Sequence, residues 1–333
     1  MANRQNTISF PDQLDFYYVI HGDKKNGAGE DSYLLDMEEQ SGIVAVFDGC
    51  GGSGARQYGE FGGHSGAYIS SRVLVEAASG WFQKSIADPR PDGKYDAVSL
   101  KRDMDRALAV YKANTISASG LKSSLIRELP STMAMLCMSR DRTKKKNAEH
   151  TSDPVRVQVF WTGDSRCYYL DPSGLYQLTD DDLPVRDAMQ NLYENAPMNN
   201  VISASAKYEI HEKQFAMGKS GILFAATDGI FGYFPSPMTF ERVLLETMGS
   251  ASGVLEWKEK LIQILEEAAG DDYTMGIFGF GFGSFPNMQR AFAGRIAVLR
   301  EMCPDQADVE SLTQVWQQYR GKYEMFLTSG RQE

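Results

Sequence analysis

The order of the predicted elements indicates an α+β fold in which helices flank two packed β-sheets. Short apolar runs bounded by glycine and polar turns predict a first group of strands, which a pair of helices follows. A second group of strands and a second pair of helices come next along the chain. Strands before and after each helix pair favour two packed sheets with the helices on their outer faces.

The first group of strands is expected at residues 16–20, 33–35 and 42–47, with polar turns between them. Apolar side chains then recur at helical spacing within residues 58–82 and 100–117. These two segments are therefore predicted to be helices that separate the first strands from the next group.

The second group of strands is expected to form a meander joined by turns. Its strands are predicted at residues 132–138, 155–161, 166–170 and 175–178. The stretch that follows, residues 180–206, is polar and irregular and includes two prolines, which favours a loop.

Three more strands and two helices complete the pattern. The strands are predicted at residues 207–215, 222–227 and 273–280. The helices are expected near residues 240–248 and 255–268, between the last two strands.

Residues 284–333 are predicted to form a C-terminal helical hairpin that follows a domain of residues 1–283. Two apolar faces at helical spacing indicate its helices. The faces are formed by Met288, Phe292, Ile296 and Leu299, and by Val309, Leu312, Val315, Trp316, Tyr319, Tyr323 and Phe326. The hairpin either packs against the larger domain, which is the favoured interpretation, or forms a lid that binds a partner or a second copy.

Composition and charge argue against several classes of protein. Of the 333 residues, 42% are hydrophobic and 23% are charged, which fits a globular protein with a sizeable core. The net charge of −10 argues against binding of nucleic acid, which depends on Lys and Arg. The cysteines show no CxxC spacing, and no apolar run is long enough to span a membrane. A cytoplasmic location without a membrane partner is expected.

Four acidic motifs beside apolar runs indicate a site for hard cations. They read VAVFDG, FWTGDSR, LFAATDG and GDDYTMGIF, and their carboxylates are Asp48, Asp164, Asp228 and Asp271. Mg²⁺ and Mn²⁺ prefer carboxylate, carbonyl and water oxygens. A glycine after the Asp lets the backbone approach a metal or a phosphate closely. A single Asp-Gly pair is more often an ordinary turn, but four such motifs in one chain are not independent turns.

In these motifs the chain resembles the metal-dependent type 2C serine/threonine protein phosphatases, the PPM family, and most of all their bacterial members. The resemblance covers about residues 13–283. Beyond the four motifs it includes Gly29-Glu30-Asp31, Ser131-Thr132-Met133-Ala134 and Leu178-Thr179. It implies an αββα sandwich of two mainly antiparallel sheets, with residues 180–206 as a variable flap that selects substrates.

The activity that this resemblance implies is hydrolysis of phosphoserine or phosphothreonine in proteins. A water activated at two Mn²⁺ or Mg²⁺ ions would attack the phosphate, which explains why no nucleophilic side chain is required. The substrate would be a phosphorylated protein, and the enzyme would oppose a serine/threonine kinase in bacterial signalling.

The implied metal ligands are carboxylates and one backbone carbonyl. They are Asp48, which would bridge the two ions, the Gly49 carbonyl on one ion, and Asp228 and Asp271 on the other. Glu30 and Asp31 would act directly or through waters. Asp164 would belong to a third metal site, but Gly232 stands where the family places the companion acid, so the third ion is in doubt.

Three further positions depart from the family pattern. Asn26 stands where the family carries a phosphate-binding Arg, so Lys24 or Lys25 would have to supply the positive charge. Cys50 replaces the His of animal members and the Met of many bacterial ones, and either fills space or is an oxidisable thiol beside the metals. Asp272 replaces the usual Asn and is expected to form hydrogen bonds rather than bind metal.

These departures leave an alternative function open. The chain could be a catalytically weak member that binds phosphoproteins and acts as a regulatory module. Because Asp48, Asp228 and Asp271 are all present, the sequence favours the active enzyme, since a pure binding module has little need for complete sets of metal ligands.

Overall fold

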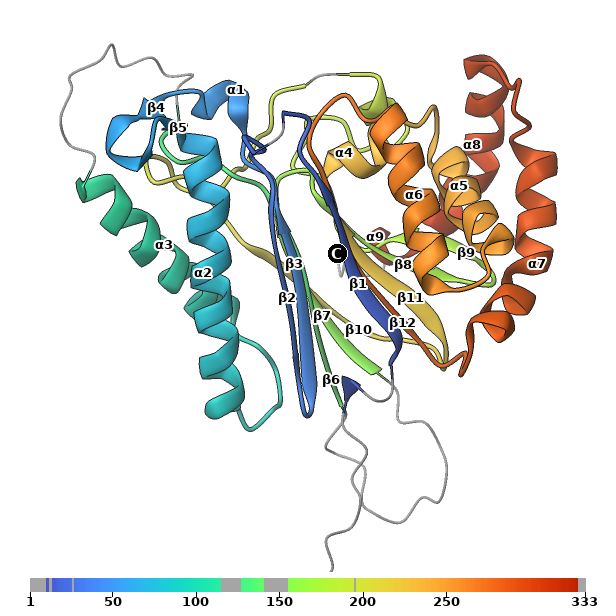
Figure 1. Cartoon of the computed structure of the whole chain (residues 1–333), viewed down its shortest axis with the longest axis horizontal. Coiled ribbons are helices and arrows are strands. Elements are labelled where there is room, and N and C mark those ends of the chain that lie inside the picture. Colours follow the sequence, from blue (N-terminus) through green and yellow to red (C-terminus); the bar gives the residue numbers. More distant parts are fainter. Residues whose placement is uncertain are drawn as a thin grey trace, which may run out of the picture.

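Two five-stranded antiparallel sheets pack face to face, and helices cover both outer faces (Figure 1). The computed structural model describes residues 10–11, 14–25, 27–114, 127–140, 155–194 and 196–328. This is the αββα sandwich predicted from the sequence, and that prediction is confirmed.

The first sheet has the strand order β1-β12-β11-β8-β9. Its strands are β1 (Leu14–Gly22), β12 (Tyr273–Phe280), β11 (Gly221–Ala226), β8 (Arg166–Asp171) and β9 (Gly174–Gln177). The second sheet has the order β10-β7-β6-β3-β2. Its strands are β10 (His211–Ala216), β7 (Val155–Thr162), β6 (Met133–Arg140), β3 (Ser41–Phe47) and β2 (Ser32–Glu38).

Two groups of helices cover the sheets, one group on each side (Figure 1). The second sheet is covered by α2 (Gly66–Ala87) and α3 (Ala97–Asn114). The first sheet is covered by α5 (Pro237–Ser250), α6 (Val254–Ala268), α7 (Phe285–Met302) and α8 (Val309–Tyr323). Shorter elements are α1 (Gly51–Gly54), β4 (Gln57–Tyr58), η2 (Gly59–Phe61), β5 (His64–Ser65), η3 (Gln190–Leu192), α4 (Asp228–Phe231) and α9 (Met325–Thr328).

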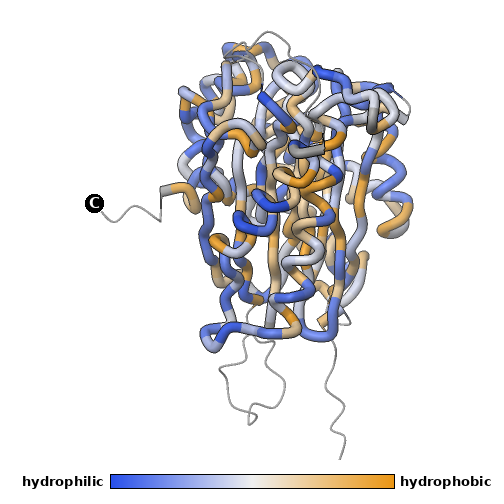
Figure 2. Tube along the Cα trace, turned by 90° about the vertical axis from the view of Figure 1, so that its left-hand side faces the viewer, coloured by the Kyte–Doolittle hydropathy of each residue, from blue (hydrophilic) through white to orange (hydrophobic). Residues whose placement is uncertain are grey.

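The core between the sheets is built from strand residues that face the opposite sheet. Val44 and Leu136 on one side and Leu223 and Phe278 on the other are fully buried in one apolar cluster. In Figure 2 the strands in the middle of the molecule are mostly white to orange, the colours of the less polar residues. Burial of apolar surface from both sheets is therefore what holds the two layers together.

The predicted strands and helices are present, and the differences concern their ends. The strand expected at residues 207–215 begins only at His211, because Asn200 engages the backbone just before it. The Asn200 side chain accepts from the N–H of Glu209 and donates to its carbonyl, both at 3.0 Å. The helix expected within residues 58–82 begins only at Gly66, so that prediction is wrong for residues 58–65. The short elements β4, η2 and β5 occupy this stretch instead, and segments so short carry no periodicity.

The C-terminal hairpin packs on the helices and strands of the first sheet through most of the apolar residues that the sequence indicates, although Val309 is 53% exposed. α7 lies on α5, and α8 contributes Leu312, Trp316, Tyr319 and Tyr323 to the same apolar cluster as the sheet. The favoured interpretation of this segment, packing against the larger domain, agrees with these contacts. The domain boundary at residue 283 stays a prediction.

None of the helices in the described part of the chain combines the length and apolar character that a membrane crossing requires.

Gly276 tests how tightly the two sheets are packed. A Cβ added there would lie 1.9 Å from Cγ2 of Val44, on the opposite sheet. We expect Gly276→Ala to lower the free energy of unfolding by about 1–3 kcal/mol through overpacking. A Cβ at Gly80 in α2 meets no atom within 4 Å, so Gly80→Ala should instead raise it by about 0.5–1 kcal/mol. Urea denaturation measures the free energy of unfolding of both variants, and equal changes in the two variants would contradict the prediction.

Candidate active site

The four acidic motifs meet at one end of the sandwich, the upper end in Figure 1, where α1 and α4 begin. Asp48 directly follows β3, and Asp228 begins α4 two residues after the end of β11. Asp271 lies just before β12, and Asp164 lies in the turn between β7 and β8. Antiparallel neighbours place the end of one strand beside the start of the next, which is why motifs far apart in sequence converge here.

Asp31 ties the two sheets together at this end. It precedes β2, and because Ser32 pairs with Phe47, it lies beside Asp48. Its side chain is buried, and Oδ2 accepts hydrogen bonds from the hydroxyls of Thr227 and Thr274, both at 2.8 Å. These two threonines belong to the TDG and DDYT motifs, so the same motifs supply an acid and the hydroxyl that orients another acid.

Asp272 holds the loop that carries Glu30. Its carboxylate accepts the backbone N–H groups of Glu30 and Lys24, each at 2.7 Å. The Glu30 carboxylate in turn accepts a short hydrogen bond from the Ser65 hydroxyl. Asp272 therefore has the hydrogen-bonding role that the sequence indicates for it.

The glycines after two of the acids are required by close backbone contacts. A Cβ at Gly49 would lie 2.5 Å from the Ala67 carbonyl oxygen and 2.8 Å from that of Glu30. A Cβ at Gly229 would lie 1.9 Å from the carbonyl oxygen of Asp272. Real side-chain carbons do not approach this closely, so the backbone at these two positions excludes any larger residue.

Burial and mutual repulsion raise the pKa values of the clustered acids. Burial, with the Asp228 charge nearby, raises the pKa of Asp31 to about 8. Burial and the Asp228 charge likewise raise the pKa of Asp164 to about 8. The pKa of Asp228 rises to about 6 through burial and Asp271, and that of Asp48 rises well above its ordinary value through burial and Asp31. Each acid affects another, so the four motifs form one electrostatic cluster.

The donor chemistry of this cluster fits a hard divalent cation. Among the residues that the structure describes, no three His, Cys, Asp or Glu side chains are arranged tightly enough to hold an ion as they stand. However, Oδ1 of Asp164 is buried and has no hydrogen-bond partner, and a cation would relieve the repulsion that raises the pKa values. Carboxylates and a nearby backbone carbonyl are the oxygens that Mg²⁺ and Mn²⁺ prefer.

The position of the missing companion acid is filled by Gly232 at the end of α4. Its N–H donates to the Asp228 carbonyl oxygen at 2.6 Å, and it offers no side-chain oxygen. Asp164 therefore has no carboxylate partner from this position, and a third ion stays a prediction.

Asp182, to which the sequence assigns no role, braces the turn that carries Asp164. One carboxylate oxygen accepts the Gly163 N–H at 2.9 Å, and the other lies 2.9 Å from Nε2 of His211. The hydrogen bond to Asp182 also raises the pKa of His211. These partners lie 19 and 29 residues from Asp182, which is why no local pattern reveals them.

The side chains that could bind phosphate by their positive charge differ in whether they are already engaged by other groups of the protein. The Lys24 ammonium donates to the Ala269 carbonyl at 2.5 Å. Lys25 is exposed, and its charge opposes the rise in the pKa of Glu30 that burial causes. Arg127 was missed by sequence reasoning because it lies outside the motifs. Its backbone N–H donates to Ser53 in α1, and its charge opposes the rise in the pKa of Cys50. Asn26 lies outside the described residues.

Cys50 is poorly suited to act as a reactive thiol in the protein without bound metal. Burial, and then the charge of Asp48, raise the pKa of its thiol well above the ordinary value. Since the thiolate is the reactive form of cysteine, this environment favours the interpretation that Cys50 fills space. The redox-sensitive alternative stays untested.

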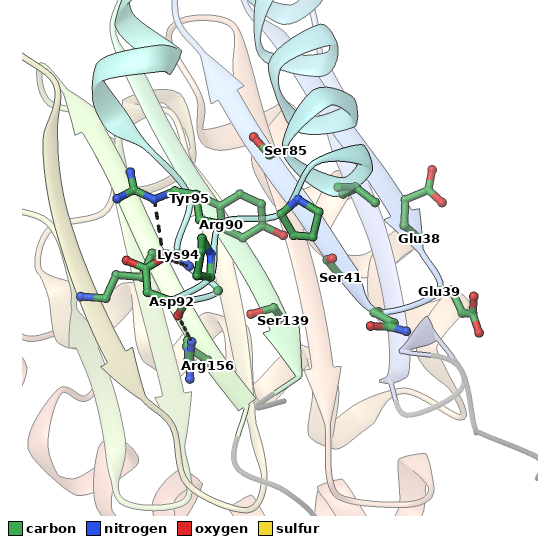
Figure 3. Close-up of a pocket in the computed structure, with 15 residues that line it drawn as sticks. Glu38, Glu39, Ser41, Ser85, Arg90, Asp92, Lys94, Tyr95, Ser139 and Arg156 are labelled. Carbon is green, nitrogen blue, oxygen red and sulfur yellow. Dashed lines mark hydrogen bonds and ion pairs between the residues drawn. The ribbon is translucent and has the colours of Figure 1, made fainter. Parts of the chain in front are cut away.

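A cavity of about 500 Å³ lies at the other end of β2 and β3, far from the acids (Figure 3). Its charged groups largely satisfy one another. Arg90 lies 3.6 Å from Asp92 and 3.5 Å from Asp96, and Arg156 donates to the Asp92 carbonyl. Its lining includes the carboxylates of Glu38, Glu39 and Asp92, whereas the acidic end of the sandwich gathers the carboxylates of all four motifs and is the better candidate for metal chemistry.

The fold is similar to those of solved bacterial phosphatases. The Mycobacterium tuberculosis serine/threonine phosphatase PstP/Ppp shares 16% identity over 80% of this chain and 98% of that chain, with a TM-score of 0.53. Serine/threonine phosphatase Stp1 from Staphylococcus aureus shares 12% over 84% and 99%, with a TM-score of 0.58. The PPM Ser-Thr phosphatase MsPP from Mycobacterium smegmatis, in complex with cacodylate, shares 14% over 81% and 100%, with a TM-score of 0.50.

No protein-family model and no curated protein matches the sequence. At these identities the structural similarity shows the fold. The chain therefore has the fold of the bacterial PPM-type serine/threonine phosphatases.

The raised pKa values predict how the metal-free protein responds to pH. Asp31 and Asp164 have folded pKa values of about 8, whereas an unfolded Asp titrates near pH ~4. Between these values the folded protein holds more protons, so the free energy of unfolding should fall as the pH rises from about 5 to 8, by at least the ~1.4 kcal/mol that corresponds to one pKa unit. Urea denaturation in EDTA measures this change.

Two further measurements connect this pH dependence to the acid cluster. Asp31→Asn should flatten the dependence, because its amide oxygen can still accept from Thr227 and Thr274 without titrating. Mn²⁺ should stabilise the wild-type protein more at pH ~8 than at pH ~5, since metal binding requires deprotonated carboxylates. Stability that rises with pH in EDTA would contradict the prediction.

Proposed function

We propose that this protein is a metal-dependent phosphatase that hydrolyses phosphoserine or phosphothreonine in proteins. The observation that carries the proposal is the convergence of Asp31, Asp48, Asp228 and Asp271 at one end of a PPM-type fold. Further support comes from a solved structure of the catalytic domain of PstP in complex with two manganese ions, which shares 15% identity with this chain at a TM-score of 0.50.

The residues that would hold two Mn²⁺ or Mg²⁺ ions are the clustered oxygen donors. They are Asp48, the Gly49 carbonyl, Asp228 and Asp271, with Glu30 and Asp31 acting directly or through waters. When bound, such ions lower the pKa of a coordinated water and neutralise charge on the phosphoryl oxygens. Thr227 and Thr274 orient Asp31, and Asp272 orients the Glu30 loop, which supports their assignment to a preformed site.

Solvent would protonate the leaving group, and cations beside the acid cluster would attract the phosphate. Cys50 holds its proton at Sγ and is a poor acid, so water would protonate the departing serine or threonine alkoxide. Lys25 and Arg127 would attract the phosphate as charges beside the acids. The substrate would be a phosphorylated protein, and the reaction would reverse a serine/threonine kinase in the cytoplasm.

Metal-dependent turnover is the direct test of this function. Hydrolysis of p-nitrophenyl phosphate and of a phosphothreonine peptide should require Mn²⁺ or Mg²⁺ and stop in EDTA. Asp48→Asn and Asp228→Asn should each lower kcat/KM at least about 100-fold, because each removes a charged metal ligand. Glu76→Gln, an exposed change on α2, is the matched control and should keep full activity.

The opposite result would identify another class of protein. If the folded, metal-loaded protein turns over neither substrate but binds the phosphothreonine peptide, the enzyme proposal fails. A phosphoprotein-binding regulatory module would then be the better description.

The choice between the candidate cations can be tested by phosphate inhibition. Lys25→Ala and Arg127→Ala should each raise the inhibition constant for inorganic phosphate roughly two- to five-fold. This is the size expected when one ionic contact between a side chain near the surface and the bound phosphate is lost. Lys24→Ala should leave it unchanged, because its ammonium is engaged by the Ala269 carbonyl. A larger effect from Lys24→Ala than from the other two would reverse this assignment.

A further inference from the structure

The segment between β9 and β10 connects the acid cluster with the C-terminal helix α8. Near its start, the Asp182 N–H donates to the Gly163 carbonyl at 2.9 Å, beside Asp164. Near its end, Ile202 pairs with Ser131, whose hydroxyl donates to the Asp48 carbonyl at 2.8 Å. The segment therefore begins and ends on backbone that positions two of the acids, and its yellow-green trace crosses the upper end of the molecule in Figure 1.

Asp187 is the point where this segment is joined to α8. Its Oδ1 accepts the N–H groups of Met189 and Gln190, both at 3.0 Å, and so caps the short helix η3. The same carboxylate accepts from Nε1 of Trp316 at 3.1 Å and from Nη1 of Arg320 at 2.7 Å. One carboxylate therefore organises the segment and attaches it to the C-terminal helix.

Arg320 adds a second contact to the segment. Its Nη2 donates to the Arg186 carbonyl at 3.1 Å, and its Nε binds Glu324 one turn further along α8 at 2.8 Å. The guanidinium thus contacts both a side chain and the backbone of the segment, which fixes its direction better than a single point charge could.

The segment is also fixed on the side of the acids. Asp181 accepts from Nε and Nη2 of Arg166, at 2.9 and 2.6 Å, and the two side chains of this pair are only 5% and 3% exposed. Asn191 donates to the same carboxylate at 3.1 Å. Arg166 follows Asp164 by two residues and lies over the ring of Phe231 in α4. The segment is thus held between the acid cluster and α8.

α8 is itself anchored to the rest of the protein by buried contacts. Tyr319 donates to Glu241 of α5 at 2.7 Å, and Glu241 is fully buried and paired with Arg295 of α7 at 2.6 Å. Trp316 and Tyr323 are each 1% exposed. A helix anchored this way can hold an irregular segment in one conformation, which the polar segment could not maintain by its own packing.

We propose that α8 positions residues 181–194 as part of the surface that binds a phosphorylated polypeptide, with Trp316 and Arg320 as positioning residues acting through Asp187. This inference rests on the proposed function and adds to it the specificity for protein substrates. A small phosphate ester needs only the acid cluster, whereas the chain on either side of a phosphorylated residue extends beyond the cluster, which residues 181–194 border through Asp181 and Asp182.

The test compares a peptide substrate with a small one in the full-length, Mn²⁺-loaded protein. Arg320→Ala should raise KM for a phosphothreonine peptide about five- to ten-fold. It should leave kcat for p-nitrophenyl phosphate within about two-fold, because the acids are untouched. Arg320→Lys should restore part of the KM, and Gln317→Ala, on the exposed face of α8, should behave as wild type.

A second measurement does not depend on activity. Hydrogen exchange of the metal-free protein should show faster exchange at residues 189–193 in Arg320→Ala, because the cap at Asp187 loses its partner. Asp187→Asn should show the same change and serves if Arg320→Ala does not fold. Faster exchange without turnover of either substrate by any variant would keep the positioning role and remove the proposed enzyme function.

Two results would overturn the inference. In one, exchange at residues 189–193 and KM for the peptide both stay at wild-type values in Arg320→Ala. In the other, turnover of the peptide and of p-nitrophenyl phosphate falls by the same factor, which would show that α8 supports the fold as a whole.

Discussion

The gathering of carboxylates at one end of the sandwich, with little access to water, is the constraint on which the rest of the site depends. Asp31 is buried and Asp48, Asp164 and Asp228 are half-buried, and their pKa values rise through this burial and through the charges of neighbouring acids. An isolated arrangement of this kind is unfavourable. It is tolerated because packed strands fix the positions of the acids and because bound cations would neutralise them.

Hydrogen bonds from residues that bind no metal provide much of that positioning. The hydroxyls of Thr227 and Thr274 converge on one oxygen of Asp31, and Asp272 holds the loop of Glu30. Thr274 lies in β12, Thr227 directly follows β11 and Asp272 directly precedes β12 of the same sheet, whereas Asp31 leads into β2 of the other. The sandwich is therefore closed at this end by polar contacts and along its length by apolar packing.

The C-terminal hairpin extends this organisation beyond the sandwich. Its apolar side chains pack on α5 and on β9, while Trp316 and Arg320 present polar groups to Asp187. One helix thus combines a structural face with contacts to the segment beside the site. The buried pair of Glu241 and Arg295 makes the arrangement specific, because either charge left alone in this interior would be strongly unfavourable.

The sequence by itself determined the longer strands and helices and the residues of the acidic motifs, because hydrophobic periodicity and glycine turns are local properties. Asp48 or Asp228 could be found in this way, since each ends an apolar run. Only the tertiary structure decided which residues form hydrogen bonds with one another. Asp182 accepts from Gly163 in the turn that carries Asp164, Lys24 donates to the Ala269 carbonyl, and Asp187 accepts from Arg320 of α8. These pairs are separated by 19, 245 and 133 residues, and such contacts exist only once the sheets and helices have packed.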